Sequence, residues 1–140
     1  MKNKLILAVL AVTIILASCK KSTTTVTTNI PPTPSILGLW KGKYGGGTAY
    51  PNAGYSFLFR ADGTVRVFAG ADTTILTNAS KAEGTYVKTA TTVTTTYTYL
   101  GGGATYSTAA PVDANITFIE GTWGAGASTT SGGLYFINKL

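Results

Sequence analysis

The sequence predicts an all-β domain in which about eight strands form an antiparallel up-and-down meander that closes into a small barrel. From residue 36 onward, short β-rich runs alternate with segments that contain Gly, Asn or Asp, and no stretch has a sustained helical period. The two Trp, eight Tyr and five Phe residues of the chain all lie between Trp40 and Phe136. Closing such a meander into a barrel removes its exposed edges. A signal peptide and a disordered tether are predicted to precede the domain.

Residues 1–18 have the organisation of a secretory signal peptide. Lys2 and Lys4 precede an apolar run over residues 5–16, which is shorter than the roughly 20 apolar residues that a membrane-spanning helix needs. The segment Leu16-Ala17-Ser18-Cys19 resembles the lipobox of bacterial lipoproteins. The resemblance implies that Cys19 becomes the mature N-terminus and carries acyl chains such as palmitate, which anchor the protein to a membrane. The predicted location is the bacterial cell envelope, at the outer membrane rather than the inner one.

Residues 19–35 are predicted to form a lipid-anchored Thr/Pro-rich tether. This segment contains no aromatic residue and ends in a Pro cluster, so it has too little apolar surface to offset the conformational entropy of ordering. The domain boundary is therefore placed at residue 36, and residues 36–140 form the predicted barrel.

The strands of the barrel are predicted where β-branched and aromatic residues lie between turn residues. The predicted strands cover residues 37–44, 54–60, 64–69, 82–88, 92–100, 105–111, 114–124 and 134–140, with a weaker candidate at 73–77. Asp62 and Gly63 form a pair that suits a hairpin turn, because both residues tolerate positive φ. Gly-rich segments at 101–103 and 131–133 separate other strands in the same way.

Alternation along the strands predicts which side chains point into the barrel. The predicted inward residues are Gly38, Trp40, Gly42 and Tyr44 in the first strand, Tyr55, Phe57 and Phe59 in the second, and Val93, Thr95, Tyr97 and Tyr99 in the fifth. The inward faces are thus rich in aromatic residues, while the outward faces are rich in Thr and Lys.

A short motif recurs along the domain. Glu83-Gly84-Thr85-Tyr86 is repeated as Glu120-Gly121-Thr122-Trp123, and Gly38-Leu39-Trp40 has the same Gly-x-aromatic core. A Gly two residues before a ring leaves room for a ring to lie over the bare backbone. With the Gly-rich meander, these motifs resemble the small barrels of the lipocalin/avidin type, and most of all the lipocalin-like domains of bacterial lipoproteins.

The resemblance covers residues 36–140 and implies that Trp40 closes the bottom of the barrel. In the lipocalin pattern an Arg near the end of the domain packs over that Trp, and the nearest candidate in this chain is Lys139. The polar residues with which avidin-like barrels bind biotin have no match in residues 45–52. The resemblance therefore implies a fold but no particular ligand.

Missing residue types exclude several kinds of chemistry. The chain has no His and a single Cys, Cys19, so His-based catalytic sets, the usual zinc ligand sets and an intramolecular disulfide are excluded. Glu83 and Glu120 occupy equivalent places in the repeat and could act as an acid–base pair, although carboxylates at such positions are more often solvated. We expect no enzyme activity, no cofactor and no metal site.

The charge of the domain also excludes one class of partner. From residue 36 onward, seven basic and five acidic residues are scattered along the chain. Nucleic-acid-binding proteins cluster their basic residues on one face, so nucleic acid is not expected as a partner.

The inward aromatic residues are the candidates for a ligand site, either as a cavity lining or as a filled core. They are Trp40, Tyr44, Tyr55, Phe57, Tyr86, Tyr97, Tyr99 and Trp123, together with Phe136. The predicted function is binding of a small apolar or amphipathic ligand, or a passive role in the envelope. The alternative is a protein-interaction module with a filled core, an inhibitor or accessory subunit that presents residues 45–53 and 124–133 to a protein partner. An open cavity favours the first function, and a filled barrel with a large exposed apolar patch favours the second.

Overall fold

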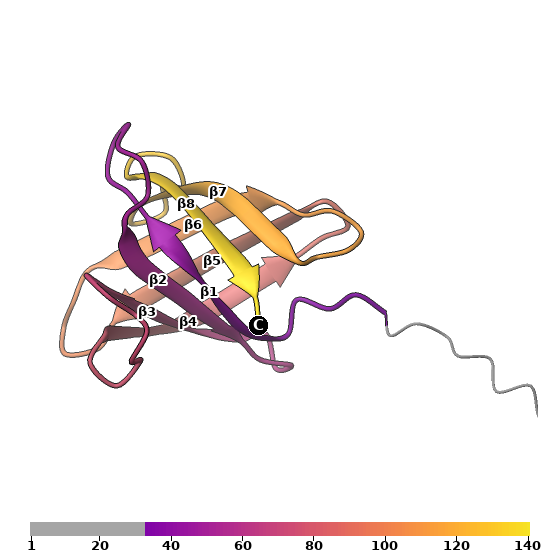
Figure 1. The fold of residues 1–140 in the computed structure, drawn as a ribbon, viewed down its shortest axis with the longest axis horizontal. Helices are drawn as coiled ribbons and strands as arrows, with labels where there is room; N and C mark the ends of the chain where they lie inside the picture. Colours follow the sequence, from indigo (N-terminus) through magenta and orange to yellow (C-terminus); the bar gives the residue numbers. More distant parts are fainter. Residues whose placement is uncertain (1–32) are drawn as a thin grey trace, which may run out of the picture. The chain divides into compact units, whose positions relative to one another are not determined.

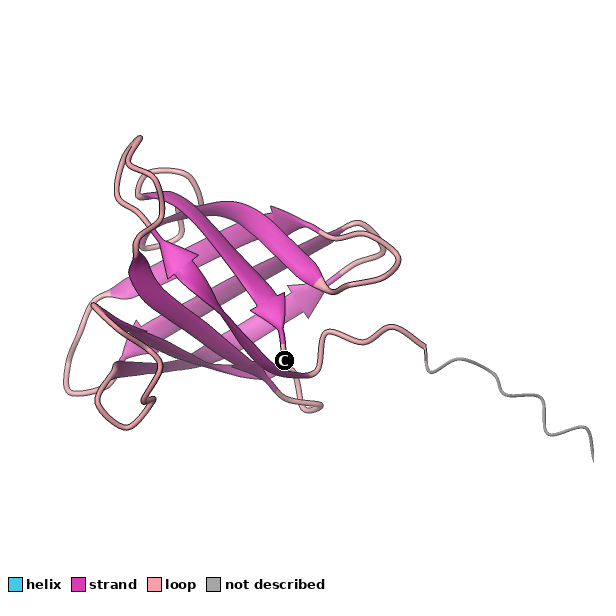
Figure 2. Ribbon diagram, in the orientation of Figure 1, coloured by secondary structure: helices cyan, strands magenta, loops and turns pink. Residues whose placement is uncertain are grey.

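The computed structural model describes residues 33–140, which form eight antiparallel strands closed into one barrel (Figure 1). The strands are β1 (Gly38–Tyr44), β2 (Ala53–Phe59), β3 (Thr64–Gly70), β4 (Ser80–Lys88), β5 (Thr92–Tyr99), β6 (Thr105–Pro111), β7 (Phe118–Ala125) and β8 (Gly133–Lys139). Strands and loops make up the whole of this described region, which contains no helix (Figure 2). The predicted signal peptide, the acylation site Cys19 and most of the predicted tether lie outside the described residues.

The pairing of the strands confirms the predicted all-β meander. Each strand pairs with the next one along the chain, and β8 pairs with β1, which places Trp40 opposite Lys139. Because the sheet closes on itself, every strand has two hydrogen-bonded neighbours and no edge is left open.

Two of the predicted strand assignments are wrong. Residues 73–77 lie in the loop between β3 and β4, where Asp72 Oδ1 accepts hydrogen bonds from the backbone N–H and the hydroxyl of Thr74. β7 begins at Phe118 rather than at residue 114, because Asp113 Oδ1 accepts hydrogen bonds from the backbone N–H groups of residues 115 and 116 and turns the chain. Asp side chains bind nearby backbone groups in this way at turns and compete with strand pairing.

The loops and turns that connect the strands lie at the two opposite ends of the barrel. At one end, here called the mouth and seen at the left in Figure 1, lie the loops 45–52, 71–79, 100–104 and 126–132. At the opposite end, the closed end, lie the turns 60–63, 89–91 and 112–117. The first described residues also join the barrel at the closed end, where Lys139 Nζ donates a hydrogen bond to the Ser35 carbonyl oxygen.

Trp40 fills the closed end of the barrel. Its side chain is completely buried, and its Nε1–H donates a hydrogen bond to the Ile36 carbonyl oxygen at 2.7 Å. Phe59 packs against it with ring centroids 6.3 Å apart, and Lys139 Nζ lies 5.9 Å from the centre of the indole. Lys139 thus occupies the place over the Trp that the resemblance assigns to an Arg.

Large side chains also fill the middle of the barrel. The largest fully buried ones besides Trp40 are Phe57, Val65, Val67, Ile119, Tyr135 and Ile137. The predicted inward positions of β1, β2 and β5 are confirmed. Ser56, which the alternation of β2 places on the outer face opposite Tyr55 and Phe57, is buried as well, because the loop 71–79 folds over it and its hydroxyl donates to Thr73 Oγ1 at 3.1 Å.

The repeated glycines Gly84 and Gly121 allow close approach of neighbouring strands. A Cβ atom added to Gly84 would collide with the Thr96 carbonyl oxygen of β5, and one added to Gly121 would collide with the Ala109 carbonyl oxygen of β6. These positions lack a side chain because the neighbouring strand comes so close.

Candidate functional site

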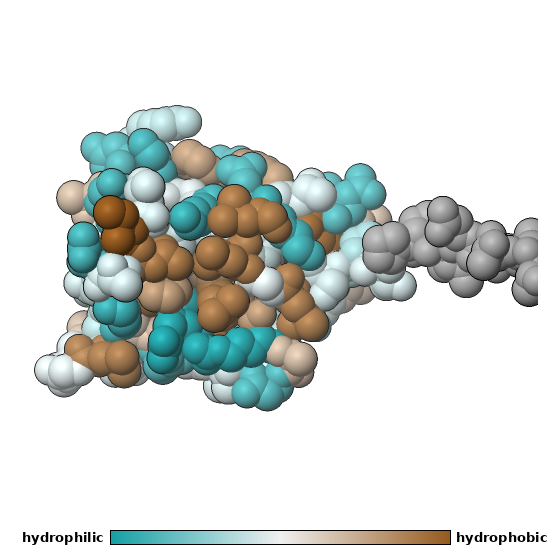
Figure 3. Space-filling view, turned by 60° about the horizontal axis from the view of Figure 1, so that its bottom comes forward, coloured by the Kyte–Doolittle hydropathy of each residue, from teal (hydrophilic) through white to brown (hydrophobic). Residues whose placement is uncertain are grey.

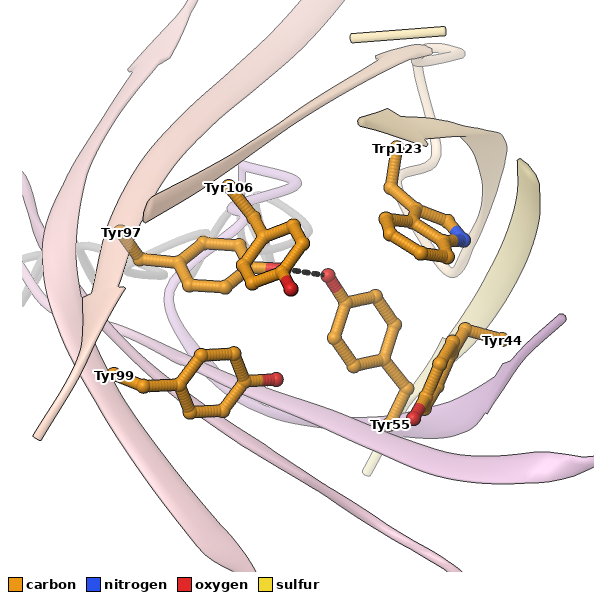
Figure 4. Close-up of a pocket in the computed structure, with 6 residues that line it drawn as sticks. All are labelled: Tyr44, Tyr55, Tyr97, Tyr99, Tyr106 and Trp123. Carbon is orange, nitrogen blue, oxygen red and sulfur yellow. Dashed lines mark hydrogen bonds between the residues drawn. The ribbon is translucent and has the colours of Figure 1, made fainter. Parts of the chain in front are cut away.

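The interior of the barrel opens at the mouth into a cavity of about 110 Å³ (Figure 4). Five tyrosines and one tryptophan line it: Tyr44, Tyr55, Tyr97, Tyr99, Tyr106 and Trp123. They come from β1, β2, β5, β6 and β7 and lie at inward positions near the mouth ends of these strands. The period of two along each strand therefore brings aromatic residues from distant parts of the sequence into one ring.

Tyr55 and Tyr97 form the floor of the cavity. Both are almost completely buried, and their hydroxyl groups form a hydrogen bond with each other. Below them, toward the closed end, Phe57 packs 4.6 Å from Tyr55 and Tyr135 packs 5.6 Å from it, measured between ring centroids. The space beneath the floor is thus filled, and the cavity ends at the two hydroxyl groups.

The walls of the cavity are half-buried rings that hold one another by edge-to-face contacts. Trp123 lies 5.7 Å from Tyr44 and 5.7 Å from Tyr106, and Tyr106 lies 5.7 Å from Tyr99, between ring centroids. Such pairs are each worth about 0.5–1.5 kcal/mol beyond the area they bury. Trp123 is fixed further by a hydrogen bond from its Nε1–H to the Gly45 carbonyl oxygen at 2.9 Å.

The hydroxyl groups of Tyr99 and Tyr106 point toward the centre of the cavity (Figure 4). Every fully buried polar side-chain atom between residues 33 and 140 has a hydrogen-bond partner. Within the same region, no protein group accepts from or donates to the Tyr99 or Tyr106 hydroxyl, so both are open to whatever occupies the cavity. Each of these two side chains offers an apolar ring and a hydroxyl without a protein partner. The cavity therefore suits a ligand that has both apolar and polar groups.

The cavity is electrically neutral. Burial raises the pKa of Tyr97 far above its usual value, and burial with the neighbouring hydroxyls raises the pKa of Tyr99 to about 12. Both phenols are therefore protonated at physiological pH. No charged residue lines the cavity, and the four mouth loops contain one charged residue, Asp72.

Five of the predicted candidates line this cavity: Tyr44, Tyr55, Tyr97, Tyr99 and Trp123. Trp40 and Phe57 belong to the filled core below it. Tyr86 lies at the closed end, where its hydroxyl donates to the Arg60 carbonyl oxygen at 2.8 Å, and Phe136 lies on the outer face of β8.

Sequence reasoning missed one lining residue, Tyr106. It pairs with Tyr97 across β5 and β6, with ring centroids 6.2 Å apart. A signal was present, because Tyr106 shares an inward face with Thr108 and Ala110 in a strand that was predicted correctly.

The two repeated glutamates do not form a site. Glu83 lies on the outer face of β4 in ion pairs with Arg60, at 3.0 Å, and with Arg66. Partial burial raises the pKa of Glu83, but the hydrogen bonds and charges of the two arginines outweigh it and hold the pKa below its usual value. Glu120 is exposed on β7, which does not pair with β4. Between residues 33 and 140, no group of three or more His, Cys, Asp or Glu side chains is placed to hold a metal ion.

Hydrophobic side chains also reach the outer surface of the barrel (Figure 3). On one part of it, Phe136 lies 6.4 Å from Tyr50 and 6.3 Å from Phe118, between ring centroids. Tyr50 is 80% exposed, Phe118 46% and the nearby Leu134 42%. We call this set the outer aromatic patch.

The described residues contain no helix that is long and apolar enough to cross a membrane. Comparisons of the chain with protein-family models, with curated proteins and with solved structures find no significant match.

Proposed function

We propose that the protein is an exported, lipid-anchored barrel of the bacterial envelope, whose mouth binds the compact end of a small amphipathic ligand. The observation that carries this proposal is the open cavity with the free hydroxyls of Tyr99 and Tyr106. An enclosed apolar cavity of about 150 Å³ holds one benzene molecule. A cavity of about 110 Å³ therefore accepts a group of a few non-hydrogen atoms, while the rest of the ligand stays outside the mouth.

The filled interior beneath the Tyr55–Tyr97 floor restricts the class of ligand further. A long acyl chain would need a channel through the middle of the barrel, and Phe57 and Tyr135 occupy that space. The ligand is thus expected to be held by one end, with apolar contacts to the rings and a polar contact to Tyr99 or Tyr106.

The lipid anchor is supported by the sequence Leu16-Ala17-Ser18-Cys19. Because the chain enters the barrel at the closed end, beside Lys139, the mouth lies at the opposite end from the point of entry.

Cys19→Ser is expected to move the protein from the membrane fraction to the soluble exported or precursor fraction, because Cys19 is the one residue that can be acylated at the lipobox. Fractionation followed by mass spectrometry of the N-terminal peptide measures this. An unchanged membrane fraction, with no lipid mass on the wild-type peptide, would contradict the anchor.

Binding at the mouth is expected to change the fluorescence of Trp123. The chain has two tryptophans, and Trp40 is completely buried at the closed end, so it serves as an internal reference. We expect 3,3-dimethyl-1-butanol, a compact neutral amphiphile, to change the emission with a dissociation constant in the millimolar range, about −4 kcal/mol. The signal should disappear in Trp123→Phe, where only Trp40 emits. A wild-type protein that shows no saturable change, or a change that persists in Trp123→Phe, would contradict binding at the mouth.

One observation favours a protein partner as the second candidate function. The loops 45–52 and 126–132 are joined by a hydrogen bond from the Gly47 N–H to the Gly132 carbonyl oxygen at 2.7 Å. They form one surface, which includes Tyr50 of the outer aromatic patch. If no small molecule binds at the mouth, this surface becomes the preferred candidate for function.

A further inference from the structure

We propose that the cavity at the mouth selects a quaternary ammonium group, so that the ligand carries a compact cation of the trimethylammonium type. This inference rests on the proposed function and names the chemical class of its ligand. Four features of the cavity support it: its size and shape, its aromatic walls, its lack of basic groups, and its lack of a carboxylate that would pair with a primary ammonium.

The size and shape of the cavity suit a rounded group. Its volume of about 110 Å³ is somewhat smaller than the roughly 150 Å³ of an enclosed cavity that holds one benzene molecule. A trimethylammonium group, a nitrogen atom that carries three methyl groups, is rounded and has fewer non-hydrogen atoms than benzene. The Tyr55–Tyr97 floor stops anything longer from entering.

The walls supply the attraction. A cation within about 6 Å of a ring centroid is drawn to the electron-rich ring face, and Trp is the best partner, followed by Tyr. Neighbouring rings of the cavity lie between 5.1 Å (Tyr44 and Tyr55) and 6.2 Å (Tyr97 and Tyr106) apart, between ring centroids. All six residues that line the cavity are aromatic, so a group that enters it contacts several rings, including that of Trp123.

The lining of the cavity disfavours an anion. No Lys or Arg lines the cavity, and none occurs in the four mouth loops, in which Asp72 is the charged residue. An anion would be removed from water without a counter-ion and placed against electron-rich rings, which costs free energy. A cation meets ring faces and phenol oxygens, and no basic residue of the lining repels it.

The cavity also distinguishes between kinds of cation. A primary ammonium has three N–H donors, each of which needs an acceptor once it leaves water. The lining offers the free hydroxyl oxygens of Tyr99 and Tyr106 but no carboxylate, and the Tyr55 and Tyr97 hydroxyls are already bonded to each other. A quaternary ammonium has no N–H group that needs an acceptor, so its transfer from water into an aromatic cavity costs less free energy.

Three probes of nearly the same shape test the inference. Choline, 3,3-dimethyl-1-butanol and 3,3-dimethylbutanoate share a branched head. Choline carries a positive charge on this head, the alcohol is neutral, and the butanoate carries a negative charge at the opposite end. Titrations at constant ionic strength, followed by Trp123 fluorescence, are expected to show choline binding at least about fivefold more tightly than the alcohol. The carboxylate is expected to bind most weakly.

Variants assign the preference to the rings. Tyr106→Leu removes a wall ring and should reduce the preference for choline over the alcohol, whereas Tyr106→Phe keeps the ring and should retain most of it. Tyr99→Leu provides a second wall variant if Tyr106→Leu does not fold. Tyr50→Leu, a tyrosine exposed on the outer surface, is the matched control and should bind choline as the wild type does.

The outcomes separate the two claims. If the alcohol binds at the mouth but choline binds no more tightly, or if the carboxylate binds best, the inference is overturned while the proposed function stands. If none of the three probes changes the emission of Trp123, both are overturned. A preference for choline that survives the loss of the wall rings would also overturn the inference.

Discussion

Trp40→Ala is expected to lower the free energy of unfolding by about 3–5 kcal/mol, the usual cost of truncating a large buried aromatic side chain. Trp40 is completely buried, packs on Phe59 and donates a hydrogen bond to the Ile36 carbonyl oxygen. The truncation leaves a cavity at the closed end and deprives that carbonyl of its partner. Since domains are stable by only about 5–15 kcal/mol in all, the variant should be severely destabilised, and unfolded if the wild type lies at the low end of this range.

Urea denaturation followed by circular dichroism measures this effect. Trp123→Phe is the matched control, because it replaces the other tryptophan, keeps a ring at a half-buried position, and should cost about 1 kcal/mol, mainly for the lost hydrogen bond to Gly45. A Trp40→Ala variant as stable as Trp123→Phe would show that Trp40 does not close the barrel.

The barrel is expected to unfold steeply between about pH 10 and pH 12. Burial raises the pKa of Tyr55 and Tyr97 well above the usual value and raises the pKa of Tyr135 to about 12. Above pH 10, the pKa of an unperturbed tyrosine, the unfolded chain releases these protons while the folded barrel keeps them. The contribution of these tyrosines to stability is therefore complete below pH 10 and is lost as the pH rises toward their folded pKa values.

Each such tyrosine lowers the stability by about 1.4 kcal/mol per pH unit in this window, so three of them give about 4 kcal/mol per pH unit. Denaturation curves at a series of pH values, with tyrosinate absorbance as a second probe, measure the slope. Tyr135→Phe should reduce the slope by one tyrosine's share. A stability that does not change between pH 10 and pH 12 would show that these tyrosines are not buried.

The inward positions could be predicted because alternation in β1, β2 and β5 is regular. In β5, Val93, Thr95 and Tyr97 are buried as predicted, while the threonines between them are exposed. The conformations of the loops depend on long-range contacts, which the local sequence pattern does not reveal. Thr73 lies in an irregular segment that covers Ser56, a residue distant in sequence, and this contact overrides its β propensity.

The division of the aromatic residues into core and cavity could not be predicted from the sequence. Phe57 and Tyr55 are neighbours on the same face of β2, and both are buried. They differ in their position along the barrel axis, because Tyr55 lies nearer the mouth than Phe57. Which of the two lines a cavity depends on the stagger between strands, which decides the rings from β5, β6 and β7 that lie at the same position along this axis. The Glu-Gly-Thr-aromatic repeat contains Gly84, where the neighbouring strand comes too close for a side chain. The carboxylate of Glu83 in the same repeat forms ion pairs with Arg60 and Arg66 on the outer face of the barrel.

Ligand binding at the mouth, above a filled barrel, is the central claim, and nuclear magnetic resonance tests it most directly. The methyl groups of choline and of 3,3-dimethyl-1-butanol each give one intense resonance, so their contacts with labelled aromatic rings can be measured. We expect nuclear Overhauser effects from these methyl groups to the rings of Tyr99, Tyr106 and Trp123, and none to Trp40 at the closed end. Effects to Tyr50 or Phe136 on the outer aromatic patch, or no effect to any ring, would contradict the claim.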